Sequence, residues 1–200
     1  MAVNRRCLPA CTLAKRNPTA RVPYLNPSDL APDNRDLSAR NINLYRALTR
    51  SPEATRSFLG IAQYIRYQSR LDPRLREMAI LQVGYSAKSP YEFSHHIKIG
   101  YDFGVTDADI RGILAETKGE ATRFTTLEKA VLRAARELTA GSSLSDETYD
   151  QLKQELDNEK VVDLLMIIAI YCGVVRLLGA LQIDVEADYE NYLKQFPLPV

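Results

Sequence analysis

The chain has 200 residues, of which 46% are hydrophobic and 26% charged, and its formal net charge is +1. This composition is typical of a globular domain with a sizeable core, and the small charge gives no overall attraction to nucleic acid or membrane surfaces. We therefore expect neither partner. The longest apolar run, residues 161–181, contains Asp163, Gly173 and Arg176, which favours a buried core helix over a membrane span.

The first 35 residues differ from the rest, with five prolines and little periodicity. Residues 1–22 carry five basic side chains and no acid. We predict a flexible basic arm over residues 1–35 and a single all-helical domain over residues 36–200. The start of the chain has no apolar run, and Cys7, Cys11 and Cys172 show no C-x-x-C spacing. We therefore expect a reducing, cytoplasmic location, and an organellar transit peptide is the alternative.

Helix start signals follow one another along the domain, and no alternating strand pattern interrupts them, so the predicted fold class is all-α. Three capping residues stand directly before a proline, at Ser51, Asp72 and Ser89, and predict helices over residues 52–69, 73–87 and 90–103. Further capping residues at Thr106, Thr125, Ser145 and Asp157 predict helices over residues 107–117, 126–139, 146–156 and 159–181. A last short helix is expected over residues 186–195.

The candidate site lies in the second and third of these helices, where the only two histidines, His95 and His96, are adjacent. Histidine is the side chain whose ordinary pKa lies near neutral pH. Glu92 precedes His96 by four residues, so both lie on one helical face, where the carboxylate can orient the imidazole and raise its pKa. Glu77 lies in a helix that is apolar on nearly all sides and is therefore expected to be buried, which makes it a candidate for a perturbed pKa.

Structural roles for these acids remain open from the pattern alone. Glu92 also completes a capping-box pattern with Ser89, and the two roles are compatible. Glu77 could instead form a structural salt bridge, for which Arg176 is the obvious partner. Tyr64 could line a pocket or only cover the edge of the core.

Other chemistries are disfavoured. Glu92 and His95 match half of an E-x-x-H di-iron site, but the second half needs another histidine, so we predict no metal. Glycine-rich phosphate loops and a thiol redox pair are absent, and Cys172 reads as an inert core residue, so we predict no cofactor.

The stretch LDPRLREMAILQVGYSAKSPYEFSHHIKIGYDFGVTDADI resembles the signature region of the carboxymuconolactone decarboxylase family, which includes alkylhydroperoxidase D. FTTLEKAVLRAARELT, LSDETYDQLKQEL and VVDLLMIIAIYCGVVRLLGALQIDVE resemble the C-terminal part of larger members, so that the resemblance covers residues 37–185. It implies an all-helical, alkylhydroperoxidase D-like fold and a trimer-based assembly, a homotrimer or homohexamer.

In the peroxidase branch of this family, a glutamate, a C-x-x-C pair and a histidine carry the activity. The resemblance places the glutamate on Glu77, the histidine on His96 and the two cysteines on Ser89 and Glu92. Both sulfurs are therefore missing, and thiol peroxidase chemistry is not expected. The decarboxylase branch acts on an anionic lactone, and a histidine–glutamate relay suits protonation of the dienolate that loss of CO₂ leaves.

We therefore predict a cofactor-free, lyase-type enzyme that transfers a proton on a small carboxylated lactone or enol substrate, as in the catabolism of aromatic compounds. His96 is the predicted acid–base residue, with Glu92 and Glu77 supporting it. Candidate substrate-binding residues are Ser89, Arg176 and Tyr64, and Arg66, Arg70 and Arg74 are further candidates for holding substrate carboxylates. The alternatives are a peroxide-reducing protein and a non-catalytic oligomeric binding protein.

Overall fold

A computed structural model describes residues 19–199, and within them the chain is helical, without a β-strand. The all-α prediction is thus confirmed. The α-helices are α1 (Asn43–Leu48), α2 (Pro52–Tyr67), α3 (Pro73–Ser86), α4 (Pro90–Asp102), α5 (Asp107–Thr117), α6 (Thr126–Ala140), α7 (Asp146–Glu155), α8 (Asn158–Leu181) and α9 (Glu190–Gln195). Short 3₁₀ helices lie at Pro27–Asp29, Pro32–Ser38 and Ala187–Tyr189.

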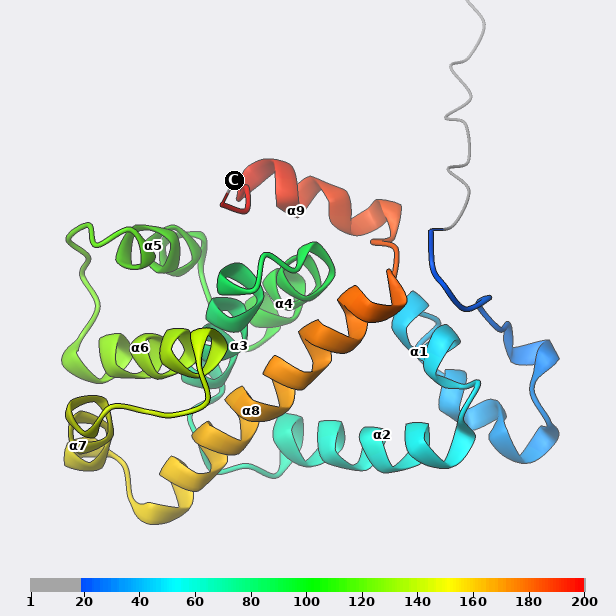
Figure 1. Ribbon diagram of the computed structural model, residues 1–200, viewed down its shortest axis with the longest axis horizontal. Coiled ribbons are helices and arrows are strands. Elements are labelled where there is room, and N and C mark those ends of the chain that lie inside the picture. Colours follow the sequence, from blue (N-terminus) through cyan, green and yellow to red (C-terminus); the bar gives the residue numbers. More distant parts are fainter. Residues whose placement is uncertain (1–18, 200) are drawn as a thin grey trace, which may run out of the picture.

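Helix α3 is the centre of the packing and contacts α4, α5, α6 and α8 (Figure 1). It begins at Asp72, whose side chain accepts a hydrogen bond from the Leu75 amide, and Pro73 follows at the first helical position. Every residue from Leu75 to Tyr85 is buried, as expected for a helix that is apolar on nearly all sides. Glu77 consequently lies in the interior.

Two hydrophobic clusters meet on α3. Ala79, Ile80 and Val83 belong to the cluster that includes residues of α6 and α8. Met78, Leu81 and Tyr85 belong to the cluster that includes residues of α4 and α5. The helix is therefore held on opposite sides, and its polar side chains keep fixed positions between the two clusters.

Helix α8 crosses the molecule diagonally in Figure 1 and has two different sides. Its inner side contributes nine buried residues, including Asp163, whose carboxylate accepts hydrogen bonds from Tyr64 (2.8 Å) and Ser69 (2.6 Å). By length and composition α8 could cross a membrane, since its most apolar window has a mean hydropathy of 2.3, and 39% of that window is buried. The outer side leaves Val162 63% exposed and Leu177 36% exposed.

The prediction of a flexible arm over residues 1–35 is wrong for residues 19–35. The Thr19 amide and hydroxyl donate to Asp184, the Arg21 amide donates to the Leu181 carbonyl, and the Tyr24 hydroxyl donates to Asp184 (2.8 Å). Its first residues thus cover the end of α8 and its later residues contact α2, and proline content does not reveal these tertiary contacts. Residues 1–18, with Cys7 and Cys11, lie outside the described residues.

Candidate functional site

The site is built where α3 and α4 approach each other closely. A Cβ atom added at Gly84 would lie 3.0 Å from the Phe93 amide nitrogen, so glycine permits a backbone approach that a side chain would resist. The turn between the helices includes Lys88 with a positive φ of 50°. This geometry sets α4 directly against α3 and brings its inner face to Glu77.

His96 lies between two carboxylates. Its Nδ1 is 2.7 Å from Glu77 Oε2, and its Nε2 is 3.0 Å from Glu92 Oε1. All three side chains are at least 93% buried. The contact with Glu92 has ion-pair distance without hydrogen-bond geometry, so Oε1 is a buried acceptor with no hydrogen-bond partner among the described residues. The structure thus brings together the three residues that the sequence singled out.

The expected capping box at the start of α4 does not form. Ser89 occupies the N-cap position, but its side chain accepts no hydrogen bond from the first turn within the described chain. Glu92 faces His96 instead of the Ser89 amide. Its place four residues before the histidine, and not its place three residues after the serine, determines what it contacts.

Arg76, which was not among the predicted site residues, completes the buried cluster. Its Nε donates to Glu77 Oε1 at 3.0 Å, and one terminal nitrogen donates to the carbonyls of Ile65 and Arg66. Its guanidinium carbon lies 4.4 Å from the centre of the Phe103 ring. Adjacent helical residues usually diverge, so the pattern gave no reason to pair Arg76 with Glu77.

Arg176, the expected partner of Glu77, lies elsewhere. Its side chain is exposed on α8 and donates to the carbonyl of Cys172, four residues earlier, at 2.6 Å. The expectation is wrong because the helical period turns position 176 toward the outer side of α8. Tyr64 is also engaged away from His96, through its hydrogen bond to Asp163.

The charges of the buried cluster around His96 stabilise one another. Burial lowers the pKa of His96, but the carboxylates of Glu92 and Glu77 outweigh it and raise that pKa to about 9. Burial likewise opposes ionisation of Glu77, but His96 and Arg76 lower its pKa overall. At neutral pH an imidazolium and a guanidinium therefore face two carboxylates, which balances their charges in the interior.

A small cavity of about 50 Å³ adjoins this cluster. His96, Glu92 and Tyr171 line it, together with the guanidinium-bearing residues Arg40 and Arg66. The Tyr171 ring meets the His96 ring edge-on, with centroids 5.0 Å apart, and burial raises the pKa of its hydroxyl well above 10. Arg66 was among the arginines considered from sequence, whereas Arg40 and Tyr171 were missed because they come from distant segments.

His95 has a different environment from His96. It is stacked between the rings of Tyr91 and Tyr189, with centroid separations of 4.0 and 3.7 Å. Its Nε2 lies 2.7 Å from Glu186, which also accepts a hydrogen bond from the Asn43 amide. His95 thereby ties α4 to the start of α1 and to the segment after α8, as expected for a structural neighbour of His96.

The other predicted site residues do not line this cavity. Its lining includes neither Ser89 nor Tyr64 nor Arg176. Among residues 19–199 there is no group of three or more His, Cys, Asp or Glu side chains that could hold a metal. Cys172 is buried and lies 3.5 Å from the Thr139 hydroxyl, away from the cavity.

Comparisons with known proteins agree with this architecture. Residues 52–137 match the carboxymuconolactone decarboxylase family. No curated protein matches the chain significantly.

Three solved structures illustrate the likeness in fold. An alkylhydroperoxidase AhpD core protein, an uncharacterized peroxidase-related protein from Ralstonia eutropha JMP134, aligns with a TM-score of 0.73 and 16% identity, covering 92% of this chain and 100% of that one. A cysteine-to-alanine variant of the debrominase Bmp8, in complex with 2,3,4-tribromopyrrole, aligns with a TM-score of 0.73 and 20% identity over 89% and 98% of the two chains. A peroxidase-related protein from Silicibacter sp. TM1040 aligns with a TM-score of 0.67 and 16% identity over 90% and 97%.

The matched region contains α2 to α5 and most of α6, and with them Arg76, Glu77, Glu92 and His96. The structural likeness extends over nearly the whole described chain. The chain thus has an AhpD-like, all-helical fold, and its residues 52–137 are similar to the carboxymuconolactone decarboxylase family.

Proposed function

We propose that the protein is a cofactor-free enzyme that transfers a proton from His96 to a small anionic substrate, in a lyase-type reaction. One observation carries the proposal: His96 Nδ1 is held by Glu77, while Nε2 faces a carboxylate without a well-formed hydrogen bond, beside a cavity. A buried imidazolium with one anchored and one loosely held proton is suited to deliver the second.

For a decarboxylation, the electron balance is simple. The C–C bond to the departing carboxylate breaks, CO₂ leaves, and the electron pair remains on the substrate as a delocalised enolate. His96 Nε2–H then protonates the enolate carbon, and the neutral imidazole regains its proton from water. Glu77 keeps Nδ1 protonated throughout, while Glu92 stabilises the imidazolium before transfer.

The cavity lining supports an anionic substrate. Arg40 and Arg66 add two cations beside Glu92 and His96, and guanidinium groups bind carboxylates in a fixed geometry. A volume of about 50 Å³ is well below the roughly 300 Å³ of small-molecule sites, so the cavity in this form accommodates water but not the substrate. We infer that the segment bearing Arg40 moves aside when substrate enters.

The alternative, peroxide reduction, takes its support from fold likeness to peroxidase-related proteins. Thiol chemistry at this cavity would need a cysteine there, and Cys172, the cysteine in the described part of the chain, does not line it. Ser89 and Glu92 stand where the resemblance places cysteines. We therefore favour proton transfer.

The test is an assay of CO₂ release from a panel of small carboxylated γ-lactones in D₂O, with mass spectrometry of the product. Wild-type protein should release CO₂ and place one deuterium on the product carbon. His96→Gln should lower turnover by about 10²–10⁴-fold, because it removes the acid.

His95→Gln is the matched comparison, since His95 lines the same cavity but its Nε2 is held by Glu186, and it should lower turnover by no more than about tenfold. Equal turnover by His96→Gln would refute the assignment. Consumption of an organic hydroperoxide with dithiothreitol, without CO₂ release, would instead favour the peroxidase alternative.

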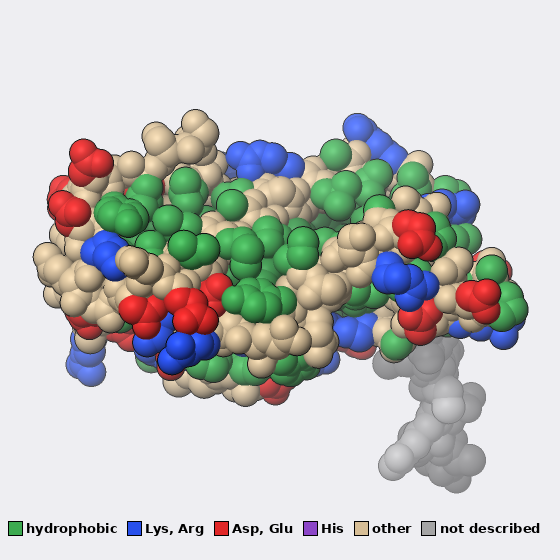
Figure 2. All heavy atoms as spheres, turned by 90° about the horizontal axis from the view of Figure 1, so that it is seen from below, with side chains coloured by type: hydrophobic (Ala, Val, Ile, Leu, Met, Phe, Trp, Pro, Cys, Tyr) green, Lys and Arg blue, Asp and Glu red, His purple; other side chains and the backbone are tan. Residues whose placement is uncertain are grey.

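We also propose that the protein self-associates through an apolar surface formed by α2 and α8. Its exposed side chains include Ile61 and Tyr67 on α2 (43% and 65%) and Val162 and Leu177 on α8. Figure 2 shows hydrophobic side chains gathered in a band across this side of the molecule. Such a band is larger than isolated exposed apolar residues require and is typical of an interaction surface.

Light scattering after size exclusion should therefore give a mass of a trimer or a hexamer of the 22.5 kDa chain. The double variant Tyr67→Glu, Val162→Glu should shift the mass toward the monomer. Lys118→Glu, an exposed substitution away from this surface, should leave it unchanged. A monomeric wild-type protein at micromolar concentration would contradict the proposal.

A further inference from the structure

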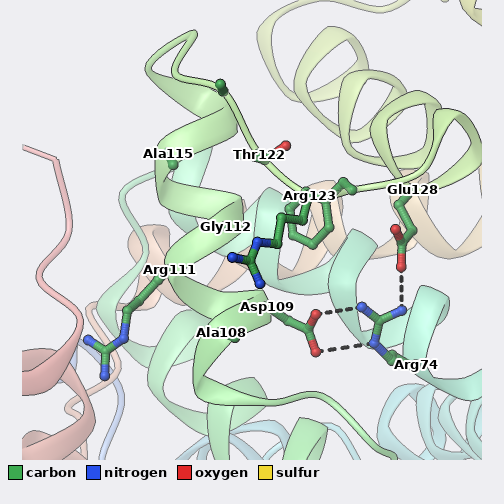
Figure 3. Close-up of a pocket in the computed structure, with 11 residues that line it drawn as sticks. Arg74, Ala108, Asp109, Arg111, Gly112, Ala115, Thr122, Arg123 and Glu128 are labelled. Carbon is green, nitrogen blue, oxygen red and sulfur yellow. Dashed lines mark hydrogen bonds and ion pairs between the residues drawn. The ribbon is translucent and has the colours of Figure 1, made fainter.

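A second and larger cavity lies between α5 and the loop that leads into α6 (Figure 3). Its volume is about 440 Å³, within the range of small-molecule sites. Its lining shares no residue with the cavity beside His96. It is therefore a separate feature, and the proposed proton transfer makes no use of it.

One wall of this cavity is apolar and closely built. The tip of the Phe124 ring packs against α5, since a Cβ atom added at Gly112 would lie 2.5 Å from its Cζ atom. Ala108 and Ala115 extend this surface along α5, and Ala121 extends it on the loop. A planar apolar group could therefore pack against the ring and the alanine methyl groups.

The acids in the lining are already engaged. Arg74 donates to both oxygens of Asp109 and to Glu128, as the dashed lines in Figure 3 mark. Asp109 also accepts from the Thr106 amide (2.8 Å), and Glu128 accepts from the Thr125 amide (2.7 Å). Because these carboxylates close capping boxes and neutralise Arg74, they are not available for a cationic ligand.

Arg123 is a cation of the cavity lining that has no partner among the described residues. Its side chain is exposed and has no hydrogen bond or ion pair to any residue of the described chain. In Figure 3 it reaches from the loop toward α5, with its guanidinium beside Gly112, whereas Arg111 points away from the cavity. Arg111 is engaged with Asp107 at 3.3 Å and with the Phe196 ring.

We propose that this cavity is a second binding site, for a small organic acid with a flat apolar body, such as an aromatic carboxylate. Arg123 pairs with the carboxylate of the ligand, since its guanidinium has no partner among the described residues, whereas Arg74 and Arg111 are already paired with acids. The body of the ligand packs on Phe124 and the alanines. The site binds and does not react, because its lining holds no histidine, cysteine or uncommitted carboxylate.

Benzoate is the probe, and binding is followed by two-dimensional NMR of the ¹⁵N-labelled protein. For a ligand with so few atoms we expect a Kd of about 10 mM or tighter, with shifts concentrated in residues 108–124. Arg123→Gln should weaken binding at least tenfold. Ala115→Leu, which fills the cavity and keeps the arginine, should weaken it to a similar degree.

Two controls separate this site from the other cavity. Arg111→Gln removes a cation of the same rim that points away, and it should leave the Kd unchanged. Arg66→Gln removes a cation at the His96 cavity, and it should also leave it unchanged. Three results would overturn the proposal. They are unchanged binding in Arg123→Gln, loss of binding in Arg66→Gln, and no saturable binding by the wild type at several times 10 mM.

Discussion

Helix α3 takes part in two clusters of charges that look alike in sequence and differ in structure. Arg74 binds Asp109 and Glu128, and every one of these carboxylates also accepts a hydrogen bond from a helix N-cap. Three residues further along the helix, Glu77 joins Arg76 to His96, and His96 in turn faces Glu92.

The two clusters differ in burial and in how completely they are satisfied. The Arg74 side chain is 31% exposed and the cluster ties the starts of α5 and α6 to α3. The Glu77 cluster is almost fully buried, and Arg76 and Glu92 each leave one polar atom without a hydrogen-bond partner among the described residues. Buried groups of this kind are costly for stability, and they occur where chemistry requires them.

Glu77→Gln should reveal the largest difference in stability between the two clusters. This substitution leaves Arg76 and His96 buried without their shared counter-charge, so we expect a loss of about 3–5 kcal/mol in the free energy of unfolding. The pKa of His96 should fall below about 9. Urea denaturation and a histidine NMR titration measure the two effects. Glu128→Gln is the matched control, because a glutamine can still close the capping box. The loss in the free energy of unfolding should then be about 1 kcal/mol or less. Equal losses in the two variants would contradict the difference between the clusters.

A smaller effect is expected from pH. The folded pKa of His96 is about 9, above the unfolded value of 6.5, so the folded state holds this proton more tightly. The resulting stabilisation, about 3 kcal/mol, is fully present below pH 6.5 and is lost as the pH rises to 9. Urea denaturation between pH 6 and 9.5 should show this decline in the wild type and a flatter profile in His96→Gln. A wild-type profile without the decline would show that His96 is not held as an imidazolium.

Much of the fold could be predicted, because capping side chains next to each helix set its boundaries. Asp72, Thr106, Thr125, Ser145 and Asp157 accept the capping hydrogen bonds that their positions predict. Helix α1 was not predicted, because it is six residues long and its N-cap position is Ile42, whose side chain cannot cap it.

The part of the candidate site that depends on spacing within a helix could be predicted. The four-residue spacing of Glu92 and His96 and the apolar setting of Glu77 selected three residues that converge. The fourth, Arg76, was missed, because a long side chain can run along its own helix to an adjacent residue where spacing rules expect divergence.

The sequence by itself determined most of the helices, the burial of α3 and the preference for His96 over His95, because capping and the 3.6-residue period act over a few neighbouring positions. Only the tertiary structure decided which arginines lie beside His96, how residues 19–24 cover the end of α8, and that Arg123 has no partner among the described residues beside a second cavity. Those features depend on segments that are distant in the chain and meet only when the helices pack.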